Sequence, residues 1–318
     1  MPAAQFPMSD MGNVVNVAQV SQYSPFRYPG GKSWFIPRLR KWLAARERPR
    51  LFLEPFAGGG SASCTVALEG LADHVVMVEL DHRVAAVWRV IFGEDADALV
   101  ERILTFEMTP ESAAAVIASD PQETFEIAWR TVVQNRVSHG GIIAPGGGVL
   151  KRGEGGKGVL SRWYPETLAR RIRALHAARH RVTVLQADAL EILEGYLYDP
   201  TVAAFIDPPY TAGGKKAGSR LYTHSTLDHE RLFALAAELD DPVLTYDLNS
   251  EVRALAERFG LQAKPISMKN AHHTVMDELL IGKELAWDTP EEPPAKTSRS
   301  RRRTAKEPTP AAVTSSPG

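Results

Sequence analysis

The tetrapeptide Asp207-Pro208-Pro209-Tyr210 follows the apolar run 202–206 and offers the clearest chemistry in the chain. Each proline lacks an N–H and fixes φ, so a buried strand over 202–206 must end there. The Asp207 carboxylate, the proline carbonyls and the Tyr210 ring then lie beyond the strand's carboxyl end, where open α/β sheets bind ligands. Acceptors beside an aromatic ring suit a flat heterocycle that carries an amino group. A simple turn whose tyrosine covers a core is the alternative interpretation.

Three consecutive glycines stand within residues 51–61, between a short apolar stretch and a helical pattern. Glycines at a strand-to-helix turn let the backbone approach a ligand closely and present N–H groups at the start of the helix. Gly58 and Gly60 match two glycines of the dinucleotide-binding fingerprint, while Ser63 stands where the third would be. The segment predicts a relaxed form of a nucleotide-binding turn.

The next apolar stretch, residues 75–78, ends at Glu79, which lies 21 residues beyond Gly58. A carboxylate at about this spacing, at the end of the second strand, binds ribose hydroxyls in such folds. Alternatively, Glu79 caps a helix that begins near Asp81.

Residues 27–33 contain a Gly-Lys-Ser sequence that suggests a phosphate-binding loop. Phe26 stands where that motif needs a glycine, and no apolar strand precedes it, so nucleoside triphosphate binding is excluded. Tyr28, a Pro-Gly-Gly turn and Lys32 are instead suited to hold the carboxylate end of an amino-acid-bearing nucleoside. A surface turn before a helix over 34–45 is the alternative.

These three segments, in this order, resemble the Dam-like DNA adenine N6-methyltransferases. The resemblance extends from about residue 26 to about residue 282. It implies an α/β fold with a Rossmann-like, S-adenosylmethionine-dependent methyltransferase sheet, helices on both faces, and an inserted, mainly helical target-recognition region. It also implies S-adenosylmethionine as the methyl donor and double-stranded DNA as the partner.

The resemblance assigns a set of residues to the methyl donor: Tyr28, Lys32, Phe56, Gly58, Gly60, Glu79, Asp188 and Asp207. Within this set, Glu79 holds the ribose and Asp188 reads the amino group of the donor's adenine. Ala189 follows Asp188, where relatives often have an aromatic residue.

The catalytic residues implied by the resemblance are Asp207, Pro208, Pro209 and Tyr210. The amine of adenine is a poor nucleophile, and the Asp207 carboxylate and the Pro208 carbonyl each accept one of its N–H bonds. Both contacts stabilise the positive charge that develops as the amine attacks the sulfonium methyl group. Tyr210 stacks on the target base, which must be flipped out of the duplex.

Other functions remain open. Asp at position 207 favours DNA adenine over protein glutamine or RNA bases, where related enzymes carry Asn. N4-cytosine DNA methyltransferases share related motifs. An RNA methyltransferase, a catalytically silent DNA-binding relative and, less well, an NAD-dependent enzyme are further alternatives.

The target-recognition region is expected over residues 93–179. Gln134-Asn135-Arg136 resembles an Asn-Arg segment of the family, although the Phe-Asn-Gly stretch that follows it there is absent here. The candidates for DNA contacts are all basic: Arg136, Lys151, Arg152, Lys157 and Arg162. Arginine can grip guanine bidentately, and lysine more often contacts phosphate. A solvated loop is the alternative interpretation.

The composition of the chain is compatible with these expectations. The chain has 318 residues and a net charge of −1, with a pI near 6.8, so DNA binding must rest on local basic clusters. A single cysteine fits a reducing cytoplasm, in a bacterium or in the host of a phage. The sequence suggests neither a membrane span nor a metal site. We expect a monomer, with a dimer as the alternative. The sequence leaves open whether the enzyme acts alone, in a restriction-modification system or for a phage.

The expected domain organisation is discontinuous. A catalytic domain over 23–92 and 180–286 is interrupted by the recognition insertion over 93–179. The ends, residues 1–22 and 287–318, are expected to be disordered because their composition cannot offset the entropy of ordering. Helical patterns occur over 81–92, 110–118, 121–136, 228–239 and 250–259. A strand is expected over 242–246, and residues 266–268 and 278–281 are expected to form an antiparallel pair.

Overall fold

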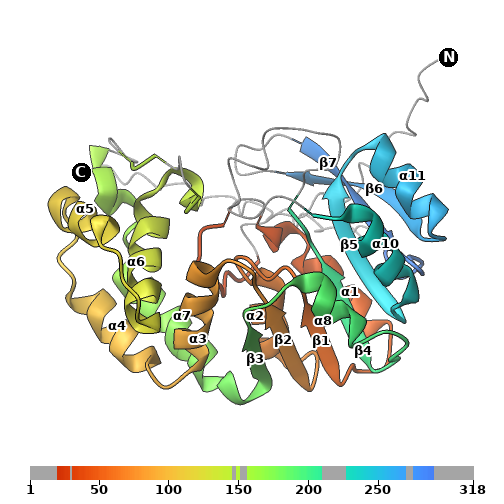
Figure 1. Cartoon of the computed structure of the whole chain (residues 1–318), viewed down its shortest axis with the longest axis horizontal. Helices are drawn as coiled ribbons and strands as arrows, with labels where there is room; N and C mark the ends of the chain where they lie inside the picture. The colour runs from red at the N-terminus through yellow and green to blue at the C-terminus, as the bar shows by residue number, and fades with distance from the viewer. Residues whose placement is uncertain are drawn as a thin grey trace, which may run out of the picture.

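A computed structural model of the whole chain describes residues 20–28, 31–144, 148–150, 156–209, 227–269 and 275–289. Its centre is a seven-stranded sheet in the order β3-β2-β1-β4-β5-β7-β6 (Figure 1). The strands are β1 Leu51–Glu54, β2 His74–Val78, β3 Val182–Leu185, β4 Val202–Ile206, β5 Asp241–Asp247, β6 Gln262–Lys269 and β7 Val275–Gly282. Strands β1 to β5 are parallel, and β7 runs antiparallel to both β5 and β6.

The strand order places the ends of several strands together. Strand β1 pairs with β2 on one side and with β4 on the other, so the chain reverses its winding direction at β1. The carboxyl ends of β1, β2 and β4 therefore meet at one edge of the sheet, which is where open α/β sheets bind ligands. Glu54, Glu79 and Asp207 lie at or just beyond these ends.

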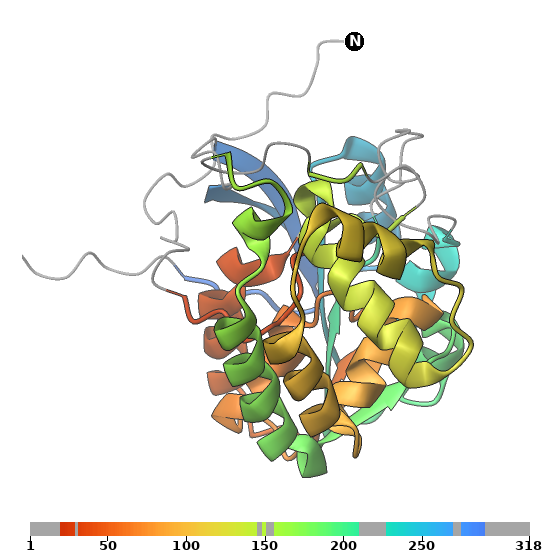
Figure 2. The same ribbon diagram turned by 90° about the vertical axis from the view of Figure 1, so that its left-hand side faces the viewer.

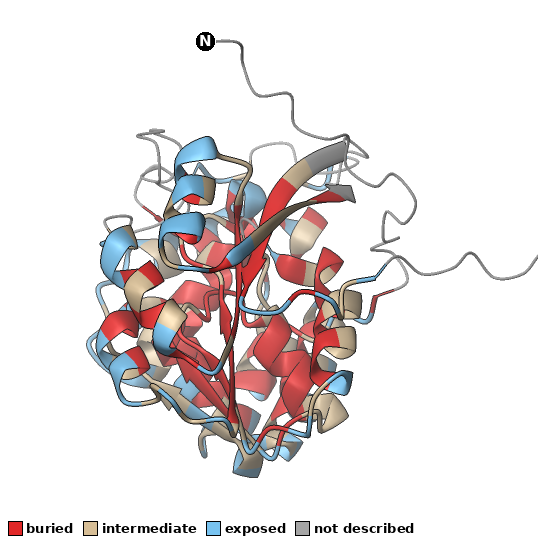
Figure 3. Cartoon of the chain, turned by 90° about the vertical axis from the view of Figure 1, so that its right-hand side faces the viewer, coloured by how far each residue is buried: buried red, intermediate tan, exposed pale blue. Residues whose placement is uncertain are grey.

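The central strands are apolar because both faces of the sheet are covered. In β4 all five residues are buried. Ala203 and Phe205 face one hydrophobic cluster, and Val202, Ala204 and Ile206 face the other. This alternation follows from the period of two along a strand. Figure 3 shows the strands as a buried layer between helices whose outer faces are exposed.

Helices pack on both faces of the sheet. They are α1 Ile36–Ala44, α2 Ser61–Glu69, α3 His82–Phe92, α4 Ala96–Thr105, α5 Pro110–Ala118, α6 Thr124–Val137, α7 Pro165–Ala177, α8 Ala189–Glu194, α10 His229–Glu238 and α11 Ser250–Arg258. The cluster on one face takes residues from α1, α2, α3 and α7, and the cluster on the other takes residues from α8, α10 and α11. The predicted fold class, a Rossmann-like α/β sheet with helices on both faces, is confirmed.

The chain between β2 and β3 is mainly helical, as expected. Helices α3 to α7 and the short 3-10 helices η3 His139–Gly141 and η5 Gly158–Arg162 form a group beside the sheet (Figures 1 and 2). Leu99, Trp129 and Leu168 belong to the same buried cluster as Phe52 and Phe205 of the sheet. The inserted helices therefore extend the core of the sheet.

Most expected elements are present, with ends shifted by a few residues. The antiparallel pair is confirmed as β6 and β7. Three helices, α4, α7 and α8, were not expected from the sequence. In α7, Pro165 at the first turn and buried Leu168, Ile172 and Leu175 were the available signal. Asp228 caps α10, where its side chain accepts a hydrogen bond from Arg231 N.

Asn249 caps α11, because its side chain accepts a hydrogen bond from Glu251 N. One expectation about the chain ends needs correction. The tail was expected to be disordered from residue 287, but Asp288 pairs with Arg38 and with Lys264, at 3.0 and 2.6 Å. Residues 1–19 and 290–318 lie outside the described residues. No described helix has the length and apolar character that crossing a bilayer requires.

Candidate active site

Asp207 is oriented by two side chains from other elements. Lys32 Nζ lies 2.9 Å from Asp207 Oδ1, and Thr245 Oγ1 donates a hydrogen bond of 2.8 Å to the same oxygen. Lys32 belongs to the 3-10 helix η2 Lys32–Trp34, and Thr245 lies in the middle of β5. The Asp207 side chain is still 20% exposed, so an oriented carboxylate is open to a ligand at the end of β4.

Lys32 is a buried cation among acidic residues. Its side chain is only 5% exposed, and Nζ lies 3.9 Å from Glu278 Oε2. Burial by itself would lower the pKa of Lys32, but Asp207, Glu278 and Asp247 together raise it above the ordinary value. Asp247 and Glu278 are directly opposed across β5 and β7, where two like charges destabilise a sheet. The Lys32 ammonium group therefore compensates part of the negative charge of these three carboxylates.

The glycine turn fits the ring of Tyr28. Gly58 and Gly60 have positive φ values of 46° and 60°. A Cβ atom at Gly58 would lie 2.7 Å from Tyr28 Cε1, and one at Gly59 would lie 2.6 Å from Tyr28 Cβ. At Gly60 a Cβ atom would lie 2.7 Å from the Trp88 ring. All three glycines are needed for this packing.

Glu79 fastens the glycine turn to the end of β2. Its Oε2 accepts a hydrogen bond from Gly58 N at 2.8 Å, and its Oε1 accepts one from Asp81 N at 2.8 Å. Burial raises the pKa of Glu79 to about 7, although both N–H groups act in the opposite direction. The cap of α3 is Asp81, whose side chain accepts a hydrogen bond from Arg83 N. The alternative in which Glu79 caps this helix is therefore wrong.

Glu54, at the end of β1, is a further carboxyl of the site that was not among the expected residues. It is buried, and its Oε2 accepts a hydrogen bond from Ser63 N at 2.9 Å. Burial, together with the nearby Asp207 and Glu79, raises the pKa of Glu54 to about 8. Position 63, where the fingerprint has its third glycine, thus contributes a backbone contact to this carboxyl.

The remaining residues expected at the donor site lie near the same edge of the sheet. Asp188 follows β3 and caps α8, with Oδ1 accepting a hydrogen bond from Leu190 N at 2.7 Å. Phe56 is half-buried against the cluster on the second face. Leu80, next to Glu79, is 44% exposed, which is unusual for a large apolar side chain in this fold. Leu80 was not among the site residues expected from the sequence, although its position directly after Glu79 could have indicated it.

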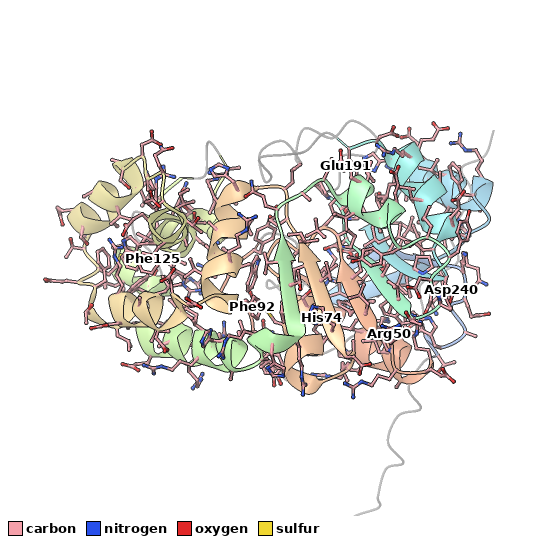
Figure 4. The ribbon with its side chains drawn as sticks, turned by 60° about the horizontal axis from the view of Figure 1, so that its bottom comes forward. Arg50, His74, Phe92, Phe125, Glu191 and Asp240 are labelled. Atoms are coloured by element: carbon pink, nitrogen blue, oxygen red, sulfur yellow. The ribbon has the colours of Figure 1, made fainter. Side chains whose placement is uncertain are left out.

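Pro208 is buried and Pro209 half-buried beyond β4. Tyr210 lies outside the described residues. Figure 4 shows the opposite edge of the sheet, where Arg50, His74 and Asp240 mark the amino ends of β1, β2 and β5. The expected site residues are absent from that edge in the described part of the chain.

One expected DNA contact is corrected. The Arg136 side chain is buried, with Nε donating to Arg162 O at 2.9 Å and Nη1 donating to Pro25 O at 3.3 Å. Its guanidinium group therefore holds the backbone together and is not presented to DNA. Lys157 is exposed and Arg162 half-buried, while Lys151 and Arg152 lie outside the described residues. No group of three or more His, Cys, Asp or Glu side chains in the described ranges is placed to hold a metal ion.

No protein-family model and no curated protein sequence matches the chain. Among solved structures, the chain is similar to a proposed RNA methyltransferase from Pyrococcus horikoshii, at 12% identity and a TM-score of 0.37, over 84% of this chain and 92% of that one. An rRNA methylase from Streptococcus thermophilus gives 12% identity and a TM-score of 0.34, over 79% and 96%. A precorrin-6y C5,15-methyltransferase from Geobacter metallireducens gives 11% and 0.32, over 87% and 97%.

Proposed function

We propose that this protein transfers a methyl group from S-adenosylmethionine to the N6 amine of a flipped-out adenine in double-stranded DNA. The observation that carries the proposal is the Asp207 carboxylate at the end of β4, held on one oxygen by Lys32 and Thr245. It lies at the edge that also presents the glycine turn and Glu79. A fixed carboxylate acceptor suits an amine that becomes positively charged during the reaction.

The residues of the site fit the donor. Both oxygens of Glu79 accept hydrogen bonds from backbone N–H groups, and a carboxylate has further acceptor capacity for a ribose hydroxyl. Exposed Leu80 offers an apolar surface next to it. The Asp207 side chain is 20% exposed, and its carboxylate attracts a positively charged ligand. S-adenosylmethionine, when bound, supplies an electrophilic methyl group on a sulfonium centre.

The chain's own groups then act on the amine. Asp207 and the Pro208 carbonyl each accept one N–H of the target amine and so favour a pyramidal nitrogen with an available lone pair. The methyl group would come from S-adenosylmethionine, and both acceptors would stabilise the positive charge that the amine nitrogen gains on accepting it. The amine then gives up one proton, and the partly exposed Asp207 offers it a route to solvent. Lys32 keeps the Asp207 carboxylate in place during this change.

Transfer of tritiated methyl groups to unmethylated duplex DNA, followed by nucleoside digestion, tests the proposal. Label is expected in N6-methyldeoxyadenosine and is expected to disappear in Asp207→Ala. The matched control is Asp240→Ala, an exposed carboxylate at the opposite edge, which should methylate normally. Label in N4-methyldeoxycytidine, in RNA or in protein would replace the proposal with one of the alternative substrates. Donor binding without any transfer would indicate a silent relative.

A further inference from the structure

Arginines from three helical elements converge on the segment before Tyr28. Arg136 of α6 donates one hydrogen bond to Pro25 O and one to Arg162 O. Its side chain therefore joins η5 to this segment. Arg171 of α7 donates from Nη1 to Ser24 O at 2.7 Å. The segment itself carries Arg27. We call Arg27, Arg136, Arg162 and Arg171 the guanidinium cluster.

The backbone of Arg27 is fixed by Asn135. Arg27 N donates to Asn135 Oδ1 at 3.0 Å, and Asn135 Nδ2 donates to Arg27 O at 2.7 Å and to Gly141 O at 2.8 Å. Gly141 has a φ of 77°, and a Cβ atom there would lie 1.9 Å from Arg27 O. This close packing sets the position from which the Arg27 side chain extends, next to the Tyr28 ring on the glycine turn.

The charges of Arg27, Arg136 and Arg171 are poorly compensated by the described part of the chain. No carboxylate of the described residues forms an ion pair with Arg27, Arg136 or Arg171. Nη1 of Arg27 is buried and has no hydrogen-bond partner within the described part of the chain. Burial and the neighbouring arginines lower the pKa of Arg27 and lower that of Arg136 to about 10. Desolvated like charges cost stability, which indicates a site built for an anion.

The surface around the guanidinium cluster suits a nucleic acid. Tyr164, 48% exposed, lies with its ring 6.0 Å from the Arg136 guanidinium carbon, and Leu160 in η5 is 52% exposed. Exposed apolar side chains beside cations are found where proteins contact nucleotides. Guanidinium groups match phosphate oxygens with paired hydrogen bonds.

We propose that Arg27 and Arg162 form a binding site for a phosphodiester group of the DNA backbone, with Arg136 and Asn135 holding the site in shape. The inference rests on the proposed function, because that function supplies the DNA. It assigns a positioning contact, independent of base sequence, to the segment that directly precedes the donor-binding Tyr28.

The test is Arg27→Gln, measured by duplex DNA binding over about 0.05 to 0.3 M NaCl. We expect affinity to fall about tenfold on unrelated sequences alike, and the slope of log Kd against log salt to lose about 0.9 in magnitude, the value for one phosphate contact. Because the change removes a repelled charge from the free protein, its thermal midpoint should be unchanged or higher. Arg162→Gln should show the same loss of slope. Arg173→Gln, an exposed charge on α7, is the matched control and should bind as the wild type.

Several outcomes would overturn the phosphate site. One is a loss of affinity in Arg27→Gln that is confined to one DNA sequence, and another is a salt slope that this variant leaves unchanged. A third is a lower thermal midpoint that accompanies the loss of binding. The fourth is a wild-type protein that does not bind duplex DNA. Failure of the proposed function looks different. In that case wild type and Arg27→Gln would differ in salt slope as expected, while neither transferred methyl groups to DNA.

Discussion

At the scale of single residues, the site depends on one buried cation and several carboxyl groups. Lys32 contacts Asp207 and lies near Glu278, and all three come from different parts of the chain. A buried ion pair is costly to break from one side, because the remaining charge is left without compensation. The pairing therefore links the chemistry of the site to the stability of the fold.

Lys32→Met should remove this compensation. We expect the free energy of unfolding to fall by roughly 3 kcal/mol, the usual result of deleting one member of a buried pair. Methyl transfer in a single turnover should slow by about two orders of magnitude, because Asp207 loses a fixed partner. Urea denaturation and rapid-quench assays measure the two effects. The control is Lys283→Met, an exposed lysine, and a fully active Lys32→Met would contradict the role given to this residue.

Glu54 gives a prediction about pH. Its folded pKa is raised to about 8 from an ordinary value of 4.5, so its contribution to stability is fully present below pH 4.5 and is lost as pH rises through about 8. Glu54→Gln keeps an acceptor for Ser63 N and cannot ionise. Urea denaturation between pH 5 and 8.5 should show a flatter profile for this variant and a higher stability than wild type at the upper end. The difference there should be on the order of 1 kcal/mol or more, because a pKa that differs by one between the folded and unfolded chains corresponds to about 1.4 kcal/mol.

The control for this pH prediction is Glu47→Gln, an exposed glutamate, which should leave the wild-type profile unchanged. A Glu54→Gln profile that parallels wild type over the whole range would show that Glu54 titrates normally in the folded protein.

At the scale of elements, the turn between β1 and α2 is shaped by contact with Tyr28. Gly58→Ala introduces a methyl group at a φ of 46°, 2.7 Å from the Tyr28 ring. We expect a loss of about 1–3 kcal/mol in stability from the strained backbone. Donor binding should weaken at the same time, because the turn must shift away from Glu79. Calorimetry with S-adenosylmethionine measures this binding.

Gly195→Ala is the matched control for the turn. Its φ is −76°, and its Cβ atom would meet Ile192 O at an ordinary 3.4 Å. This variant should bind the donor as the wild type does. Normal donor binding by Gly58→Ala would mean that the turn adapts without the glycine conformation.

At the scale of the whole molecule, the inserted helices and the sheet share one buried cluster. Trp129 of α6 is buried and makes edge-to-face contacts with Phe106 and Trp163, with ring centroids 4.9 and 6.3 Å apart. The same cluster reaches Phe52 and Phe205 in the sheet. A continuous core of this kind predicts that the insertion and the sheet unfold together.

Trp129→Ala tests this cooperativity. We expect a loss of about 3–5 kcal/mol and a single unfolding transition, observed alike by far-ultraviolet circular dichroism and by hydrogen exchange in β4. Tyr198→Ala, which removes an aromatic ring that is 71% exposed, should change stability far less. Two separate transitions in Trp129→Ala would show that the insertion is an independent unit.

The sequence by itself determined the features that depend on local rules. Proline ends β4 after Ile206, glycines permit the positive φ values of the turn, and apolar runs that end at turn residues indicate the strands. These rules led to the antiparallel pair β6 and β7, whereas the fold class was implied by the resemblance to a methyltransferase family. The same rules, together with the spacing of 21 residues between Gly58 and Glu79, pointed to Glu79.

Only the tertiary structure decided which groups meet and how far they are buried. The contact of Lys32 with Asp207, the raised pKa of Glu54 and the burial of Arg136 arise from residues distant in sequence. The buried Nη1 of Arg27 has the same origin. Desolvation and charge pairing depend on every neighbour in space, so a linear pattern of residue types cannot specify them. A basic residue such as Arg136 therefore looks the same in sequence whether its side chain is exposed to a ligand or holds the backbone.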